Sequence, residues 1–198
     1  IMETLGFMPT SNPAMSMGMP SSQISSTDVW QELLDNEELL KKQYDIIKGR
    51  MPEKYNEVVI IADKNNEIND FTIYSLGLKD ASVLPQLMED IKNGKEVDTE
   101  QTSYTYDELL GLEFKLLLNT DYYEKQGDIW VDKSKDNDYL RQKLKDSETI
   151  KVVGILRPSD EAVSSTMREG IGYTASLMEH LVNEVNKSEI VKAQKDNE

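Results

Sequence analysis

A single histidine, His180, is the side chain of this sequence best suited to moving protons near neutral pH. It falls in a predicted helix over residues 174–186, on the side away from the apolar residues that should face a core. These apolar residues are Leu177, Met178, Leu181, Val182 and Val185. The sequence also lacks the Gly-x-Ser-x-Gly turn that would present a serine nucleophile to a histidine base. We therefore expect His180 to face solvent as an ordinary surface residue.

Two polar loops place oxygen atoms at alternate positions, as calcium-binding loops do. The first contains Asp63, Asn65 and Glu67, and the second contains Asp132, Ser134 and Asp136. A calcium loop also needs glycine at its sixth position and glutamate at its twelfth. The residues found there are Ile68 and Tyr74 in the first loop, and Asn137 and Lys143 in the second. Both loops are therefore predicted to be solvated turns and not metal sites.

Three methionines near the start of the chain, Met15, Met17 and Met19, could offer thioether ligands to a soft ion such as Cu(I). The same side chains suit an apolar arm that docks onto a partner or onto the domain itself. We favour the second interpretation, so that no metal site is predicted here.

Adjacent carboxylates occur as Glu37-Glu38 and Glu89-Asp90, each pair within a predicted helix. Neighbouring side chains on a helix diverge by about 100°, so the two members of a pair cannot share a substrate proton. No Gly-x-x-x-x-Gly-Lys loop is present to hold a nucleotide phosphate. The sequence therefore predicts no catalytic residue, no cofactor-binding residue and no metal ligand, and the protein is not expected to be an enzyme.

The composition excludes further classes of function. The 198 residues include 37 acidic and 22 basic side chains, for a formal net charge of -15. This balance argues against a nucleic-acid partner, because phosphate binding needs clustered lysine and arginine. The absence of cysteine excludes disulfides, zinc-thiolate sites and thiol catalysis. The longest apolar run, Val58–Ala62, is too short to span a bilayer.

The elements that would position these residues begin after residues 1–27, which read as an extended or mobile arm rich in Met, Ser and Pro. Residues 28–198 are predicted to form one domain. A helix should start with Asp28 as its N-cap and carry Trp30, Leu33 and Leu34 on one face. Leu40 and Tyr44 continue this face, with a break possible at Asp35-Asn36.

Strands are predicted over 44–52, 57–62, 113–118, 149–156 and 171–173, with a hairpin over 122–132. Helices are predicted over 71–76, from Ser82 to Gly94, over 137–144, over 174–186, and from Ser188 to the end of the sequence. The strands 58–62 and 152–156 are apolar on both faces, so they should be neighbours in the main sheet and covered by helices. Strands and helices mix without strict alternation, which predicts an α+β fold with a mixed sheet.

Four segments follow one another along the chain with a recognisable order and spacing. A Gly-Arg turn closes residues 44–52, and the strand Glu57-Val58-Val59-Ile60 follows it. The remaining segments are Gly111-Leu112-Glu113-Phe114 and Ile150–Pro158, which contains Val-Val-Gly-Ile-Leu. Together with residues 171–174 and 189–194, this set resembles the extracellular domain of MacB/FtsX-type ABC transporter permeases, especially those of Gram-positive, clostridia-like bacteria. The resemblance covers about residues 28–195.

The resemblance implies a domain between the first and second transmembrane helices, outside the cell. Such a domain has a larger porter-like lobe and a smaller inserted lobe, which would fall at about residues 95–146 here. It would carry ATP-driven motion from the cytoplasm to export or extract a substrate such as a peptide or lipid. Expected partners are a second permease copy or paralogue, an ABC ATPase reached through the membrane part, and an extracellular adaptor protein.

Two other classes of function stay open. A free-standing secreted or lipid-anchored substrate-binding protein would close two lobes on a ligand. A hydrolase with an unrecognised site is the least favoured class, given the residues above. For a two-pass domain, Glu198 and the ordered start near Asp28 should lie at the same end of the molecule, because both chain ends must return to one membrane.

Overall fold

The structure is a computed structural model that describes residues 29–83, 86, 89–90, 92–95, 102–160, 162 and 166–196. The predicted arm over 1–27, its methionines Met15, Met17 and Met19, and the predicted N-cap Asp28 lie outside the described residues. Five residues of the helix predicted between Ser82 and Gly94 (84, 85, 87, 88 and 91) also lie outside them. Of its described residues, 86, 89, 90 and 92 are helical, and Ala81–Val83 form a short 3-10 helix, η1.

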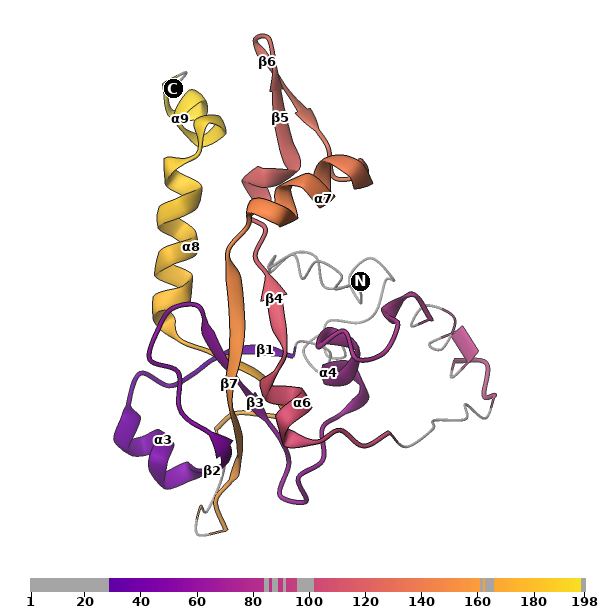
Figure 1. The fold of residues 1–198 in the computed structure, drawn as a ribbon, viewed down its shortest axis with the longest axis vertical. Coiled ribbons are helices and arrows are strands. Elements are labelled where there is room, and N and C mark those ends of the chain that lie inside the picture. Colours follow the sequence, from indigo (N-terminus) through magenta and orange to yellow (C-terminus); the bar gives the residue numbers. More distant parts are fainter. Residues whose placement is uncertain are drawn as a thin grey trace.

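The main sheet is mixed and has six strands in the order β1–β8–β3–β7–β2, with β4 also pairing with β7 (Figure 1). The strands are β1 (Trp30–Glu32), β2 (Tyr44–Gly49), β3 (Glu57–Ile61), β4 (Glu113–Lys115), β7 (Thr149–Pro158) and β8 (Gly170–Tyr173). β1 runs parallel to β8 and β3 parallel to β7, and the other pairings are antiparallel. Together with the helices that cover it, this sheet makes the protein an α+β fold, as the sequence predicts.

The predicted neighbours in the sheet are confirmed, because β3 and β7 pair in parallel with Val58 opposite Val152. Side chains 58–61 of β3 are all 0% exposed, so this strand is the centre of the core. Val153, in contrast, is only partly buried. The continuous apolar run of β3 therefore marks a strand buried on both faces.

Helices cover the two faces of β3 unequally. On one face Val58 and Ile60 pack in a cluster with Leu177 and Leu181 of α8 (Ala175–Lys187). The same cluster takes in Leu76 after α4 (Asp70–Ser75) and Leu109 of α6 (Tyr106–Leu110). On the other face Val59 and Ile61 pack with residues that include Leu40 of α3 (Glu37–Gln43) and Met167.

A smaller unit extends away from the sheet at one end of the molecule (Figure 1). It consists of η2 (Asn119–Tyr122), the hairpin of β5 (Tyr123–Gln126) and β6 (Ile129–Asp132), and α7 (Asn137–Asp146). We call residues 119–146 the hairpin lobe. Two other elements in the predicted 95–146 range, α6 and β4, contribute Leu109 and Phe114 to the main core.

The helix predicted from Asp28 is wrong over Trp30–Glu32 but confirmed over Glu37–Gln43, after the break at Asp35-Asn36. Trp30–Glu32 form strand β1, which pairs in parallel with Ile171–Tyr173 of β8. The helix α3 begins only after Asn36, whose side chain accepts a hydrogen bond from the Leu39 amide at 3.0 Å. The sheet edge therefore overrides the local helical pattern, and Asn36 supplies the N-cap that starts the helix.

The last two helices, α8 and α9 (Glu189–Lys195), follow the prediction, with Ser188 capping α9 through the Val191 amide. In Figure 1, α9 lies at the same end as the hairpin lobe, whereas β1 lies near the middle of the long axis. The expected meeting of both chain ends is therefore not seen for the described elements, and Glu198 lies outside the described residues. Among the helices of the described part, none has the length and apolar character needed to cross a membrane.

Candidate functional site

The first candidate region is the turn after β2, where the Gly-Arg motif and the strand Glu57–Ile60 meet. Arg50 donates two hydrogen bonds to the Glu57 carboxylate, at 2.8 and 2.7 Å. The amides of Glu53 and Lys54 also donate to Glu57, at 2.8 and 3.2 Å. Glu57 is 6% exposed, and the bond from Arg50 is the main reason that its pKa is lowered to about 2. This arrangement clamps the loop between β2 and β3 and leaves no oxygen of Glu57 free for chemistry.

Two glycines make this turn possible. Gly49 has φ +81°, and a Cβ atom there would lie 2.2 Å from the carbonyl oxygen of Val153. Gly154 is its partner in the β2–β7 register, and a Cβ atom on it would lie 2.1 Å from the carbonyl oxygen of Arg50. The motifs at 44–52, 57–60 and 150–158 therefore form one interlocked unit whose parts lie far apart in the sequence.

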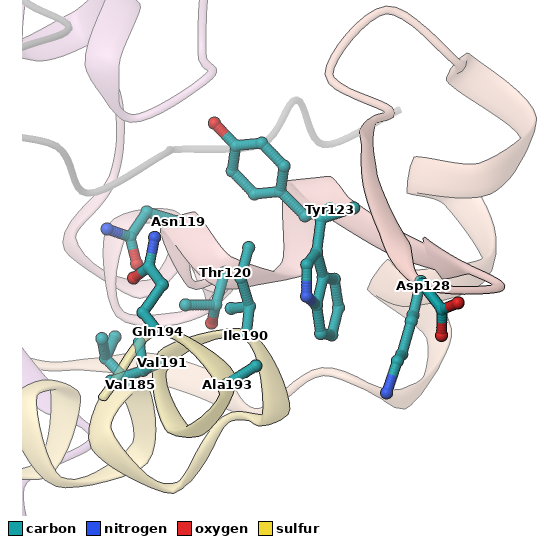
Figure 2. Close-up of a pocket in the computed structure, with 11 residues that line it drawn as sticks. Asn119, Thr120, Tyr123, Asp128, Val185, Ile190, Val191, Ala193 and Gln194 are labelled. Atoms are coloured by element: carbon teal, nitrogen blue, oxygen red, sulfur yellow. The ribbon is translucent and has the colours of Figure 1, made fainter. Parts of the chain in front are cut away.

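A groove between the hairpin lobe and the C-terminal helices is the second candidate region (Figure 2). Its volume is about 610 Å³, which lies within the range of small-ligand sites. One wall comes from the hairpin lobe and the other from α8 and α9. The lining residues are Asn119, Thr120, Tyr123, Lys125, Asp128 and Trp130 on the first wall, and Val185, Ile190, Val191, Ala193 and Gln194 on the second.

The groove combines apolar side chains with amide and hydroxyl groups and with two charged side chains, Lys125 and Asp128. Figure 2 shows Ile190, Val191 and Val185 on the helical wall, and Gln194 and Asn119 line opposite walls of the groove. The hairpin lobe carries seven acidic and six basic residues, so this end is nearly neutral in a chain of net charge -15. The groove therefore suits a partly apolar group that also carries polar atoms, and sequence reasoning missed it because its walls are far apart along the chain.

The hairpin lobe has little apolar core of its own, since no residue of η2, β5, β6 or α7 is buried. The Tyr139 ring has the ammonium groups of Lys133 and Lys143 each 5.7 Å from its centre. Its hydroxyl donates to the Tyr123 carbonyl oxygen at 3.2 Å. Polar contacts and the connection to the sheet therefore hold this lobe.

That connection consists of residues 115–118 entering the lobe and 147–149 leaving it, which we call the neck. The Leu116 amide donates to the Glu148 carbonyl oxygen at 3.0 Å. The Lys115 ammonium donates to the Ser147 carbonyl oxygen at 3.1 Å and to the Thr149 hydroxyl at 3.0 Å. The two segments of the neck are thus tied together where β4 and β7 begin to pair.

His180 lies against the neck, so the prediction that it faces solvent is wrong. Its side chain is 20% exposed, and its Nε2 atom lies 3.0 and 3.1 Å from the two carboxylate oxygens of Glu148. The Tyr55 ring stacks on the imidazole, with centroids 4.0 Å apart and an interplanar angle of 26°. The Tyr55 hydroxyl donates to Glu148 at 3.0 Å. Burial and this bond raise the pKa of Tyr55.

The error about His180 came from the residues assigned to the buried face of α8. Leu177 and Leu181 are buried, but Val182 is 55% exposed. When the face is centred on Leu177 and Leu181 alone, His180 lies only about 80° away, close enough for its ring to fold onto the neck. An apolar stripe limited to Leu177 and Leu181 predicts that His180 lies at the edge of the core.

The remaining sequence candidates have structural roles. Asp63 accepts hydrogen bonds from the amides of Asn65 and Glu67 at 2.8 and 2.7 Å, so its loop closes on itself. Asp132 accepts one from the Ser134 amide at 2.8 Å, and Asp136 caps α7. Within the part of the chain that the structure describes, no three histidine, aspartate or glutamate side chains gather as metal ligands.

The two carboxylate pairs also lie at the surface. Glu37 pairs with Lys41 at 2.6 Å in the first turn of α3, and Glu38 is exposed. Asp90 accepts from Lys95 at 2.7 Å, and Glu89 is exposed.

Comparison of the chain with protein-family models, with curated proteins and with solved structures finds no match.

Proposed function

We propose that this chain is a non-catalytic extracellular domain of an ABC transporter permease of the MacB/FtsX type. It would couple ATP hydrolysis in the cytoplasm to the export or extraction of a substrate such as a peptide or lipid. The observation that carries the proposal is the meeting of the resembling segments in space. β2, β3, β4 and β7 contain these segments, and all of them pair around β7.

The pairs Gly49–Gly154 and Arg50–Glu57 strengthen this argument. Each glycine allows the main chain of the other segment to approach, and Arg50 binds the first residue of the next motif. Residues that depend on one another in this way should recur together and in order. That dependence favours reading the motifs as marks of one fold and not as separate chance matches.

The arrangement of the hairpin lobe, its neck and the groove is compatible with a domain that binds a partner and changes conformation. The hairpin lobe joins the sheet through a two-segment neck and faces α9 across the groove. A permease domain that passes on motion needs units that can shift relative to one another. The partners in this proposal are a second permease copy or paralogue, an ABC ATPase reached through the membrane part, and an extracellular adaptor protein.

The alternative is a free-standing secreted or lipid-anchored substrate-binding protein. The same groove favours it, because its walls belong to two units that could close on a ligand. The two proposals differ in how the protein is held at the cell surface.

Fractionation of the source cells separates them. The permease proposal expects the protein in membranes after washing with carbonate at high pH, and apolar stretches of about 20 residues flanking this region in its gene. Release into the medium or by the wash would select a secreted binding protein, and retention in membranes without such stretches in the gene would select a lipid-anchored one. Recovery in the cytosol would contradict both.

A further inference from the structure

We propose that Tyr55, Glu148 and His180 form a pH-sensitive latch that fastens the neck of the hairpin lobe to α8. The three residues come from three separate places: the loop before β3, the outgoing segment of the neck, and the middle of α8. The Glu148 carboxylate is their common partner, since it contacts the His180 ring nitrogen and accepts a hydrogen bond from the Tyr55 hydroxyl. The latch extends beyond the proposed function and does not depend on it.

Glu148 occupies a position from which its side-chain contact can affect the whole neck. Its carbonyl oxygen accepts the Leu116 amide of the incoming segment, so the contact of its side chain bears on both segments of the neck. α8 continues through Ser188 into α9, which forms one wall of the groove, whereas the neck carries the opposite wall. A contact between α8 and the neck therefore lies at the base of both walls.

The charges around His180 decide the direction of the switch. Glu148 on the neck faces its Nε2 atom, and Tyr55 stacks on the ring. On α8 itself, Glu184 lies one turn away, and its pKa is lowered mainly by Lys187 and to a smaller extent by His180. On the neck, Lys115 is occupied by Ser147 and Thr149 beside Glu148.

Protonation of His180 converts a neutral hydrogen bond to Glu148 into a charge-assisted pair. Histidine is the side chain whose ordinary titration lies between about pH 5 and 8, and glutamate stays ionised over most of this range. The latch should therefore be tight in mild acid and loose at mildly alkaline pH. Tightening holds α8 against the neck and restrains the groove.

The test is a double-mutant cycle on the 198-residue chain with His180→Gln, Glu148→Gln and both changes together, followed by urea unfolding. The coupling between the two positions should be about three- to fivefold larger, as a ratio of unfolding constants, near pH 5.5 than near pH 8. Equal coupling at the two pH values, or larger coupling at pH 8, would overturn the latch.

A second measurement reads the groove directly. The chain has two tryptophans, and Trp30→Phe leaves Trp130 in the groove as the sole reporter. In this background, acrylamide should quench Trp130 less efficiently as the pH is lowered from about 8 to about 5.5. Once His180→Gln is added, the quenching efficiency should be the same at both pH values. Since His180 is the only histidine, a pH response that survives His180→Gln has another source and contradicts the proposal. Constant quenching with His180 in place would also contradict it.

Discussion

Arg50 and Glu57 show how two residues of a short motif fix a loop. The Glu57 carboxylate is nearly inaccessible and receives four hydrogen bonds, two from Arg50 and two from main-chain amides. A buried carboxylate is stable only with such partners, because its desolvation otherwise costs several kcal/mol. The loop between β2 and β3 is therefore held by charge as well as by packing.

Removing that charge should be costly. Glu57→Gln keeps the shape of the side chain but loses the ion pair, so the free energy of unfolding should fall by about 2–3 kcal/mol near pH 7. Because the folded pKa of about 2 lies below the ordinary value of 4.5, the contribution of Glu57 is present above 4.5 and lost as the pH falls toward 2. Urea unfolding of both proteins across this range measures the difference.

Glu38→Gln is the matched control, since Glu38 is an exposed carboxylate in α3. It should change stability by less than about 0.5 kcal/mol at every pH. If the difference in the free energy of unfolding between wild type and Glu57→Gln stays constant from neutral pH to about pH 2, the assigned role of the charge is contradicted.

Gly49 and Gly127 offer a second matched pair. Both have positive φ, +81° and +63°, but only at Gly49 would a Cβ atom meet the main chain, 2.2 Å from the Val153 oxygen. Gly127→Ala should therefore cost about 1 kcal/mol and Gly49→Ala about 3 kcal/mol or more, because β2 must also separate from β7. Thermal unfolding compares them, and equal losses would show that the close approach is not required.

At the scale of elements, the local sequence pattern is enough to predict a strand or helix whose own side chains define it. The continuous β-branched run of β3 identifies the central strand, and the turn residues Gln126-Gly127-Asp128 identify the hairpin. β1 was missed because three residues at a sheet edge depend on β8 for their hydrogen bonds. No periodicity within Trp30–Glu32 indicates that distant partner.

Helix α8 gives the element-scale prediction. Leu177 is 0% exposed, and Val182 on the same helix is 55% exposed. Leu177→Ala should lower the free energy of unfolding by about 2–5 kcal/mol through the cavity it leaves. Val182→Ala should change it by less than about 0.5 kcal/mol. Denaturant unfolding of the two variants is the measurement, and a large loss from Val182→Ala would place the apolar stripe where the sequence suggested.

At the scale of the whole molecule, the sequence predicted the class of fold but not the candidate sites. The groove needs the hairpin lobe beside α9, and the latch needs Tyr55, Glu148 and His180 together. These contacts join segments separated by tens of residues or more, and each segment alone is an ordinary loop or helix face. Hydrophobic periodicity cannot report such meetings.

The absence of a phosphate-binding loop leads to a prediction for the isolated chain. Mg-ATP at millimolar concentration should leave the thermal midpoint unchanged within about 1 °C, because a ligand stabilises only the state that it binds. A nucleotide-dependent rise, absent with Mg-pyrophosphate, would show a specific site and contradict a domain that leaves ATP hydrolysis to a separate subunit.

The central claim is that this domain faces the outside of the cell. The lack of cysteine in these 198 residues allows a direct measurement, once any cysteine elsewhere in the full-length protein is replaced by serine. Gln142→Cys is exposed on α7, whereas Val59→Cys is buried in β3 and serves as the control. In intact source cells that carry the full-length protein, a membrane-impermeant maleimide should label Gln142→Cys without lysis. Val59→Cys should react only after denaturation. Labelling of Gln142→Cys that begins only when the cells are lysed would contradict an extracellular domain.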